Sequence, residues 1–206
     1  MTLDDLEAKI KEAPKPAGLE QTADTLVFGE GDANANVLII GEAPGEQEDQ
    51  TGRPFVGRAG QLLDQILASV NMHRDEIYIT NIVKYRPPGN RNPTTDEIHA
   101  SEPLLIEQLN ILQPQIIATL GNVPTQYFLK TKDGITKTRG NWFDWQGVKL
   151  MPLFHPAYLL RNPSRKRGGP KWLMWQDMQE LKRAADELGA KPNTFKIDTT
   201  EQSGLF

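Results

Sequence analysis

The sequence feature that most constrains this chain is an apolar run, Val37 to Ile40, that ends in a turn rich in glycine, proline and carboxylates. Beyond the turn, apolar residues recur at helical spacing from about residue 57 to residue 70. A strand, a loop and a helix in this order predict the first half of a parallel βαβ unit. Ligands of open α/β sheets bind beyond the carboxyl ends of the strands. We therefore expect the acidic turn to line a crevice.

The same alternation of strand and helix patterns continues along the chain. Further strands are expected at about 76–83, 115–121 and 148–154, and helices at about 3–11, 94–112, 123–129 and 170–188. Strands that alternate with helices favour a parallel sheet covered on both faces. We therefore predict an α/β fold, a three-layer αβα arrangement with a four-stranded parallel central sheet. Residues 1–188 are expected to form a single domain, and the polar residues 189–206 a flexible C-terminal tail.

The composition excludes several kinds of site. The chain of 206 residues contains no cysteine, which rules out disulfides, thiolate zinc sites and cysteine-ligated iron–sulfur clusters. We accordingly expect no metal and no cofactor. The N-terminal residues lack a cationic start with an apolar signal core, and no apolar run approaches the length that spans a membrane. The expected location is therefore cytoplasmic.

The net charge of −4 does not by itself indicate a protein that binds nucleic acid, but the distribution of charge is more informative. Acidic residues crowd the termini and the expected helices, whereas cations fall in or beside the expected loops. Because local potential rather than net charge decides phosphate binding, such a basic face is compatible with it. The cations concerned are Arg53, Arg58, Lys84, Arg86, Arg91, Arg161, Arg165, Lys166, Arg167 and Lys171.

Three strand ends carry polar residues suited to chemistry: Glu42 after the first core strand, Asn81 near the end of the second and His155 after the fourth. Each has an ordinary explanation, as a solvated turn carboxylate, a strand-end amide that bonds its own backbone, or a turn histidine before proline. Three such residues at one edge of a sheet favour a functional site. The turn after the first strand is not a phosphate loop, because no Gly-Lys-Ser/Thr follows it.

Three blocks of sequence are informative when taken together. They are Gly41-Glu42-Ala43-Pro44-Gly45 with Gly52-Arg53-Pro54-Phe55, Thr80-Asn81-Ile82-Val83-Lys84 with Arg86-Pro87-Pro88-Gly89-Asn90-Arg91, and His155-Pro156-Ala157-Tyr158-Leu159-Leu160-Arg161. In this order and spacing they closely resemble the conserved motifs of family-4 uracil-DNA glycosylases. The resemblance covers about residues 26–188.

The resemblance implies a pocket for a base that is flipped out of DNA. Phe55 would stack on the base. Asn81 would read the uracil edge by donating to O4 and accepting from N3–H, a pattern that cytosine mismatches. Gly41 and Ala43 would lie against the base. His155 would donate to O2, where negative charge grows as the N-glycosidic bond breaks.

The resemblance also implies two catalytic carboxylates, Glu42 and Glu48, which would orient a water molecule and stabilise the cationic sugar. The sequence does not apportion these two roles. Better-known relatives have an aspartate at the position of Ala43, so the activation of water either lies elsewhere in this chain or is weak.

A DNA-binding segment would follow His155. By resemblance, Leu159 or Leu160 would wedge into the gap left by the flipped nucleotide. Phosphates would be held by Arg58, Arg161, Arg165, Lys166 and Arg167, which would make binding weaken as salt rises.

The chain departs from family-4 enzymes at the [4Fe–4S] cluster, which those enzymes hold through four cysteines. The corresponding positions fall near Pro14, Ala17, Tyr85 and Ser101. We therefore interpret the chain as a cluster-free branch in which ordinary packing, with Tyr85 as a candidate, replaces the cluster. A covalently trapping relative carries a histidine-bearing insert after the second strand. Because no histidine occurs between residues 84 and 98, covalent capture of DNA is not expected.

The function expected from the resemblance is that of a monofunctional uracil-DNA glycosylase of base excision repair. Such an enzyme hydrolyses the bond between uracil and deoxyribose in DNA, leaves an abasic site, and is expected here to be a monomer. Activity on a wider range of deaminated bases stays open. The alternative from another class is a catalytically silent DNA- or clamp-binding module, which the joint presence of Glu42, Asn81 and His155 disfavours.

The last five residues suggest a partner protein. They resemble the short peptide with which bacterial replication and repair proteins bind the sliding clamp, and Gln202, Leu205 and Phe206 would make the contacts. The other interpretation is a disordered apolar end, or an end that docks on its own domain.

Overall fold

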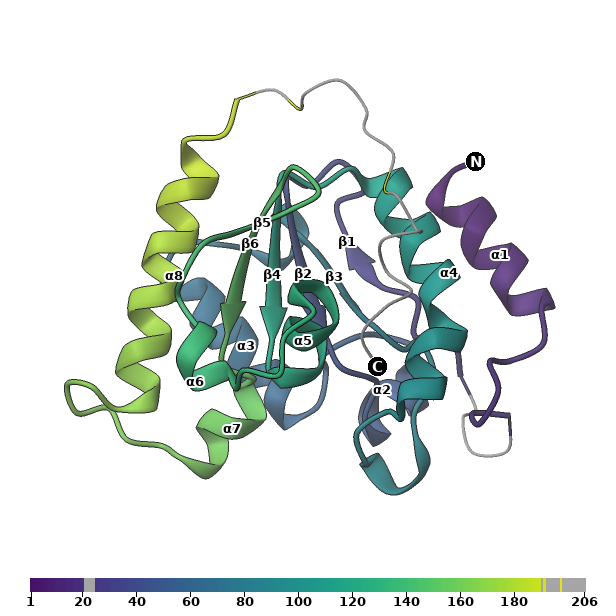
Figure 1. Cartoon of the computed structure of the whole chain (residues 1–206), viewed down its shortest axis with the longest axis horizontal. Coiled ribbons are helices and arrows are strands. Elements are labelled where there is room, and N and C mark those ends of the chain that lie inside the picture. Colours follow the sequence, from purple (N-terminus) through teal and green to yellow (C-terminus); the bar gives the residue numbers. More distant parts are fainter. Residues whose placement is uncertain (21–24, 190, 192–196, 198–206) are drawn as a thin grey trace.

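Four buried strands run parallel through the centre of the protein, whose computed structural model describes residues 1–20, 25–189, 191 and 197. They are β2 (Val37–Gly41), β3 (Tyr78–Asn81), β4 (Ile116–Leu120) and β6 (Val148–Leu153). Every residue of β2, β3 and β4 is buried, as expected for parallel strands that are covered on both faces. The parallel pairs β3–β2, β2–β4 and β4–β6 confirm the predicted four-stranded parallel centre (Figure 1).

Two short antiparallel strands, which the sequence does not predict, extend the sheet at its edges. β1 (Glu30–Gly31) pairs with β3, and β5 (Phe143–Trp145) pairs with β6. The strand order is β1-β3-β2-β4-β6-β5. With 2 and 3 residues, β1 and β5 carry too little periodicity to be recognised without the partner strand.

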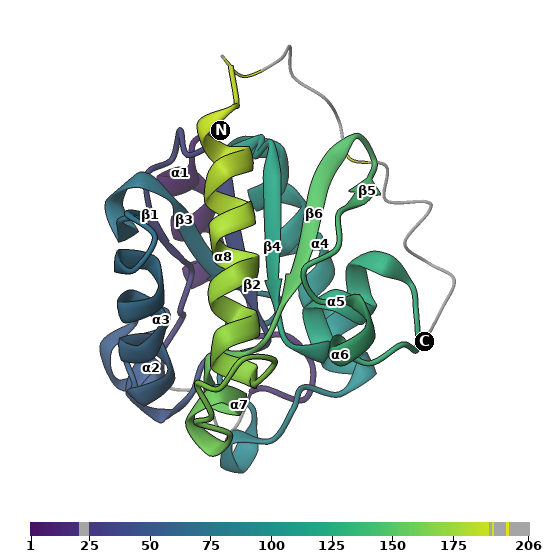
Figure 2. The ribbon, with the colours of Figure 1, turned by 90° about the vertical axis from the view of Figure 1, so that its left-hand side faces the viewer.

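Helices cover both faces of the sheet, which confirms the three-layer arrangement (Figures 1 and 2). One face carries α1 (Leu3–Glu12), α4 (Thr95–Leu112) and α5 (Asn122–Leu129). The other face carries α3 (Arg58–Ala68) and α8 (Pro170–Asp186). Shorter helical segments lie in the connections: α2 (Glu46–Thr51), α6 (Ile135–Thr138), α7 (Pro156–Arg161), and the 3₁₀ turns Arg74–Glu76 and Pro88–Asn90.

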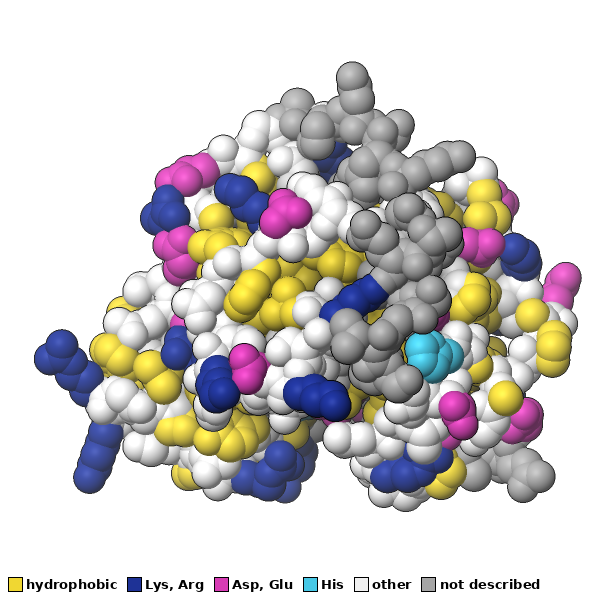
Figure 3. Space-filling view, viewed as in Figure 1, with side chains coloured by type: hydrophobic (Ala, Val, Ile, Leu, Met, Phe, Trp, Pro, Cys, Tyr) yellow, Lys and Arg dark blue, Asp and Glu magenta, His cyan; other side chains and the backbone are white. Residues whose placement is uncertain are grey.

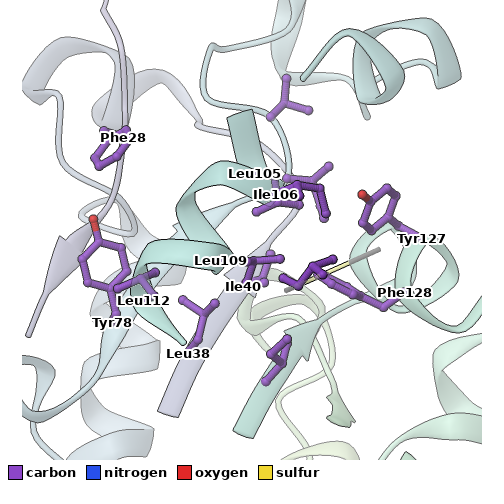
Figure 4. Close-up of a cluster of buried hydrophobic side chains, with 14 of the residues drawn as sticks. Phe28, Leu38, Ile40, Tyr78, Leu105, Ile106, Leu109, Leu112, Tyr127 and Phe128 are labelled. Carbon is purple, nitrogen blue, oxygen red and sulfur yellow. The ribbon is translucent and has the colours of Figure 1, made fainter. Parts of the chain in front are cut away.

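Alternate residues of the central strands contribute to two separate cores, because successive side chains of a strand point to opposite faces. On β2, Leu38 and Ile40 belong to the core under α4, whereas Val37 and Ile39 belong to the core under α3 and α8. Figure 4 shows the first of these cores, in which Leu38 and Ile40 lie close to Leu109 of α4. The sheet is therefore anchored on both sides, and its edge is a rigid support for the loops that follow.

The carboxyl ends of the four parallel strands meet at one edge of the sheet. The chain leaves β2 through α2 to reach α3, leaves β3 through the 3₁₀ turn at Pro88–Asn90 to reach α4, and leaves β6 directly into α7. Both α2 and α7 lie at this edge, which is the lower side of the molecule in Figure 1. The three polar residues that the sequence singles out stand at the ends of these strands or just beyond them.

Among the described helices, none combines the length and the apolar character needed to span a bilayer. The predicted tail, residues 189–206, lies outside the described residues except for 189, 191 and 197. The clamp-like peptide, residues 202–206, lies entirely outside them.

Candidate active site

A cavity of about 530 Å³ opens at the edge where the parallel strands end. Glu42 follows β2, Asn81 ends β3, Gly121 follows β4 and His155 follows β6, and all four line the cavity together with Phe55. They meet because parallel strands present their carboxyl ends at the same edge. The structure therefore brings together the three strand-end residues that the sequence singles out.

Gly41 lets two of these side chains pack against the end of β2. A β-carbon at position 41 would collide with Asn81 Oδ1 and with Phe55 Cζ, so only glycine leaves room for both. Ala43, two residues further on, lines the same cavity. The four predicted base-binding residues, Gly41, Ala43, Phe55 and Asn81, are thus neighbours.

Phe55 has a left-handed backbone, with φ 53°, which is strained for an aromatic residue. Arg74 stabilises this conformation, because its guanidinium donates to the carbonyl of Pro54 and, at 3.0 Å, to the carbonyl of Phe55. The centroid of the Phe55 ring lies 5.9 Å from that of the His155 ring. Two predicted site residues that are distant in the sequence are therefore in the same pocket.

Asn81 presents an unused acceptor beside the cavity. The residue is 1% exposed, and within the described part of the chain its Oδ1 has no hydrogen-bond partner. A buried acceptor without a donor costs about 1–3 kcal/mol. A ligand N–H in the cavity would supply the missing donor, which is the contact that a base-reading amide makes.

His155 is the N-cap residue of α7, and its Nδ1 accepts a hydrogen bond of 3.1 Å from the backbone N–H of Ala157. A neutral imidazole whose Nδ1 accepts carries its proton on Nε2. Burial, and secondarily the charge of Arg161, lowers the pKa of His155 to about 4. At neutral pH the ring is therefore an uncharged donor through Nε2–H.

Glu42 is a partly buried carboxylate at the cavity. No side chain or backbone N–H of the described residues hydrogen-bonds to it. Burial raises the pKa of Glu42 to about 6, although the nearby charge of Arg161 opposes this shift. The group is thus mainly ionised at neutral pH and has both oxygens available for a water molecule or a ligand.

Glu48 differs from Glu42 because backbone N–H groups occupy its carboxylate. Oε2 accepts from Gly45 at 3.1 Å, and Oε1 accepts from Val56 at 2.9 Å and from Gly57 at 2.7 Å. These bonds tie the start of α2 to the segment that leads into α3. Glu48 lines the cavity, but its oxygens hold the loop that carries Phe55.

One of the predicted phosphate-binding cations lines the cavity, and the other four are exposed. Arg161 lines it, and Arg58, Arg165, Lys166 and Arg167 are exposed, the first at the start of α3 and the others in the loop between α7 and α8. Figure 3 shows Lys and Arg side chains along the lower side of the molecule, which is the side where α7 lies in Figure 1. The predicted phosphate-binding cations are therefore accessible.

Leu159, one of the two leucines predicted to enter DNA, is buried in the structure. Leu159 is 1% exposed and packs in the core beneath α3 and α8, because its position on α7 faces the protein. Leu160, the next residue of α7, is 36% exposed. Of the two leucines proposed as a wedge, only Leu160 can reach a ligand without unpacking the core.

The residues at the cluster positions do not fit a [4Fe–4S] group. Tyr85 is buried, with Lys15 Nζ 5.7 Å from its ring centroid, Ser101 is buried, and Pro14 and Ala17 are exposed. None of these side chains supplies a thiolate, and the whole chain has no cysteine. The described residues also contain no group of three or more His, Cys, Asp or Glu side chains that could hold a metal.

Sequence reasoning missed Gly121, which lines the cavity, and Arg74, which holds the backbone at Phe55. Gly121 has φ 92°, and a β-carbon there would lie 2.9 Å from Glu42 Oε1 and 3.2 Å from His155 Cβ. The signal that could have found Gly121 is its position directly after a buried strand, like that of Gly41. Arg74 has no such signal, because it acts on Phe55 from a 3₁₀ turn distant in the sequence.

Comparison with known proteins agrees with this geometry. Residues 28–179 match the family model of the uracil DNA glycosylase superfamily. A type-4 uracil-DNA glycosylase of Thermotoga maritima is 46% identical over 153 residues, which cover 73% of this chain and 79% of the relative. One of Sulfurisphaera tokodaii is 39% identical over 95% of this chain and 90% of the relative. A type-5 uracil-DNA glycosylase of Pyrobaculum aerophilum is 30% identical over 77% of this chain and 75% of the relative.

Proposed function

The chain belongs to the uracil DNA glycosylase superfamily, and from this premise we propose that it is a monofunctional uracil-DNA glycosylase. It binds DNA, flips a uracil nucleotide into the cavity and hydrolyses the N-glycosidic bond, which leaves an abasic site. The observation that carries this proposal is that Glu42, Phe55, Asn81 and His155 line a single cavity at the edge of the sheet.

Recognition of uracil falls to Phe55 and Asn81. The Phe55 ring stacks on the base, and Gly41 and Ala43 lie against it. The unpartnered Asn81 Oδ1 accepts from uracil N3–H, and the amide N–H donates to O4. Cytosine has an acceptor at N3 and a donor at N4, so both contacts would fail.

His155 stabilises the departing base. As the bond breaks, negative charge moves to uracil O2, and the Nε2–H of a neutral His155 donates to that oxygen. The fixed bond from Ala157 to Nδ1 aims the ring before the reaction, so no reorganisation is needed in the transition state.

The sequence did not apportion two catalytic roles between Glu42 and Glu48, and we assign both to Glu42. This residue orients water and stabilises the cationic sugar, because among the described residues no group donates to its carboxylate. Glu48 acts instead as a positioning residue, because its oxygens accept three backbone N–H groups.

DNA binding uses the cationic edge. Arg58, Arg161, Arg165, Lys166 and Arg167 hold phosphates, and Leu160 enters the gap left by the flipped nucleotide. In this proposal residues 1–188 form one glycosylase domain of a monomeric, cytoplasmic protein.

The deciding experiment incubates the protein with a uracil-containing oligonucleotide and then cleaves abasic sites with alkali. We expect strand scission at the uracil, none with a matched oligonucleotide that carries thymine, and a rate that falls at least a hundredfold for His155→Ala. Absence of scission with the wild-type protein would contradict the proposal and favour the catalytically silent DNA- or clamp-binding module.

The C-terminal peptide is a separate part of the proposal. Gln202, Leu205 and Phe206, on a tether, would bind an apolar pocket of the sliding clamp. Deletion of residues 202–206 is expected to abolish clamp binding in a pull-down and to leave uracil release unchanged. Equal clamp binding by the full chain and the deletion variant would end the idea.

A further inference from the structure

Lys84 is a fully buried lysine that the proposed mechanism does not use. The residue is 1% exposed, and no carboxylate of the described residues lies within ion-pair distance of its Nζ. An isolated charge is costly to bury, and most buried charges in proteins are therefore paired. An unpaired buried lysine three residues after Asn81 thus points to a use for its charge.

Three oxygens lie within hydrogen-bond distance of Lys84 Nζ. Nζ lies 2.5 Å from Thr80 Oγ1, 2.8 Å from the Asn81 carbonyl oxygen and 2.6 Å from Gln108 Oε1. The Thr80 hydroxyl and the Gln108 amide both donate to the Phe28 carbonyl, at 2.7 and 3.1 Å, so each turns an acceptor toward Nζ. Burial lowers the pKa of Lys84, but a neutral amine has only two N–H groups. The ammonium form can donate to all three oxygens, whereas a neutral amine would donate to two of them and accept from the Thr80 hydroxyl.

We infer that Lys84 is a positioning residue that holds the Asn81 carbonyl and places a positive charge behind this base-reading residue, where it stabilises the anionic base as it leaves. This inference rests on the proposed function. Within a protein interior a charge is weakly screened. Its attraction for the base grows as negative charge moves onto the base, so it favours the transition state over the bound substrate.

Gln108→Glu tests the charge with little change of shape. The new carboxylate still accepts from Lys84 Nζ but neutralises its charge. We expect single-turnover uracil release to slow about tenfold with an unchanged KM. The melting temperature should fall, because a carboxylate cannot donate to the Phe28 carbonyl as the Gln108 amide does. Lys84→Met removes the charge and should slow release at least as much, whereas Lys84→Arg, which keeps it, should retain more activity. Gln115→Glu is the matched control. Gln115 directly precedes β4, at the end of the strand away from the cavity, and its amide donates to Asn36. This variant should not slow release.

The identity of the leaving base separates an electrostatic role from a merely structural one. Fluorine at C5 stabilises the departing anion, so 5-fluorouracil needs less help from a positive charge. The Gln108→Glu variant should therefore lose less rate on a 5-fluorouracil oligonucleotide than on a uracil one. Equal losses on both substrates would overturn the electrostatic role. So would a ¹⁵N resonance of Lys84 Nζ in the wild type that has the shift of a neutral amine.

The wild-type protein, assayed in parallel, distinguishes this inference from the proposed function. Failure of the wild type to release uracil would overturn both. Release by the wild type together with full activity of Gln108→Glu would overturn the inference alone. If Lys84→Met does not fold, the Gln108→Glu results decide.

Discussion

At the scale of single residues, three acid–base side chains at the cavity have been given different properties by their surroundings. Burial raises the pKa of Glu42 to about 6 and lowers that of His155 to about 4, whereas Glu48 is occupied by backbone N–H groups. At neutral pH the site therefore pairs an ionised, unpartnered carboxylate with a neutral imidazole. Such a pair can serve a cationic sugar on one side and an anionic base on the other.

The first prediction concerns Glu42. In the wild type, the single-turnover rate of uracil release should rise with pH through about 6, because Glu42 must lose its proton to orient water. Glu42→Gln should lower the rate by about 10²–10⁴-fold and abolish this step. Glu46→Gln, on the exposed side of α2, is the matched control and should preserve both rate and step. A rate in the wild type that does not change on either side of about pH 6 would count against this role.

The second prediction concerns Asn81. Asn81→Asp replaces the amide donor by an oxygen, which can accept from the N4 amino group of cytosine. The ratio of the rates on uracil and cytosine oligonucleotides should fall at least about tenfold, the effect of about 1.4 kcal/mol in discrimination. Asn122→Asp is the matched control, because Asn122 also lines the cavity but its Oδ1 accepts from Ile135 N–H. An unchanged ratio for Asn81→Asp would contradict the base-reading role.

At the scale of elements, the connection from β2 to α3 is held in shape from two directions. Glu48 ties the start of α2 to Val56 and Gly57, and Arg74 holds the carbonyls of Pro54 and Phe55. The left-handed backbone of Phe55 persists because these contacts offset its strain. The connection therefore places an aromatic ring rigidly beside His155.

The third prediction follows from this arrangement. Glu48→Ala leaves three backbone N–H groups without their acceptor and should lower the free energy of unfolding by about 1–3 kcal/mol, measured by urea denaturation. Uracil release should slow as well, because Phe55 is no longer fixed. The same change at Glu46, an exposed residue of the same helix, should have little effect on either quantity. A Glu48→Ala variant as stable as the wild type would show that these bonds do not hold the connection.

At the scale of the whole molecule, a net negative charge coexists with a group of exposed cations. The chain carries a net charge of −4, yet Arg161 lines the cavity and Arg58, Arg165, Lys166 and Arg167 are exposed. Some acidic side chains form ion pairs on α1 and α8. We therefore expect DNA to bind at the side that carries Arg161 and the loop between α7 and α8.

The fourth prediction concerns salt. Replacement of Arg165, Lys166 and Arg167 by glutamine should weaken binding to DNA of any sequence, and should reduce the slope of log K against log salt by about 2–3. Neutralisation of Lys9, Lys11 and Lys182, which pair with acidic side chains on other faces, should leave the slope unchanged. An identical slope for wild type and loop variant would remove this loop from the DNA-binding surface.

The pattern of apolar and polar residues in the sequence was sufficient to predict the three layers of this protein and the polar residues at the ends of its strands. An apolar run such as Val37–Ile40, followed by a turn and a helical period, can bury both of its faces only inside a parallel sheet. The meeting of Glu42, Asn81 and His155 then follows from the direction of the strands. Their roles came from resemblance to a family and stay predictions.

Only the tertiary structure decided which of two residues of the same type is available to a ligand and which is hydrogen-bonded or buried within the protein. It separated Glu42 from Glu48 and Leu160 from Leu159, added the edge strands β1 and β5, and joined Lys84 to Gln108 of another element. The physical reason is that burial and hydrogen-bond partners depend on contacts between distant segments. Neighbouring residues of the same type look alike in sequence, and only packing gives them different surroundings.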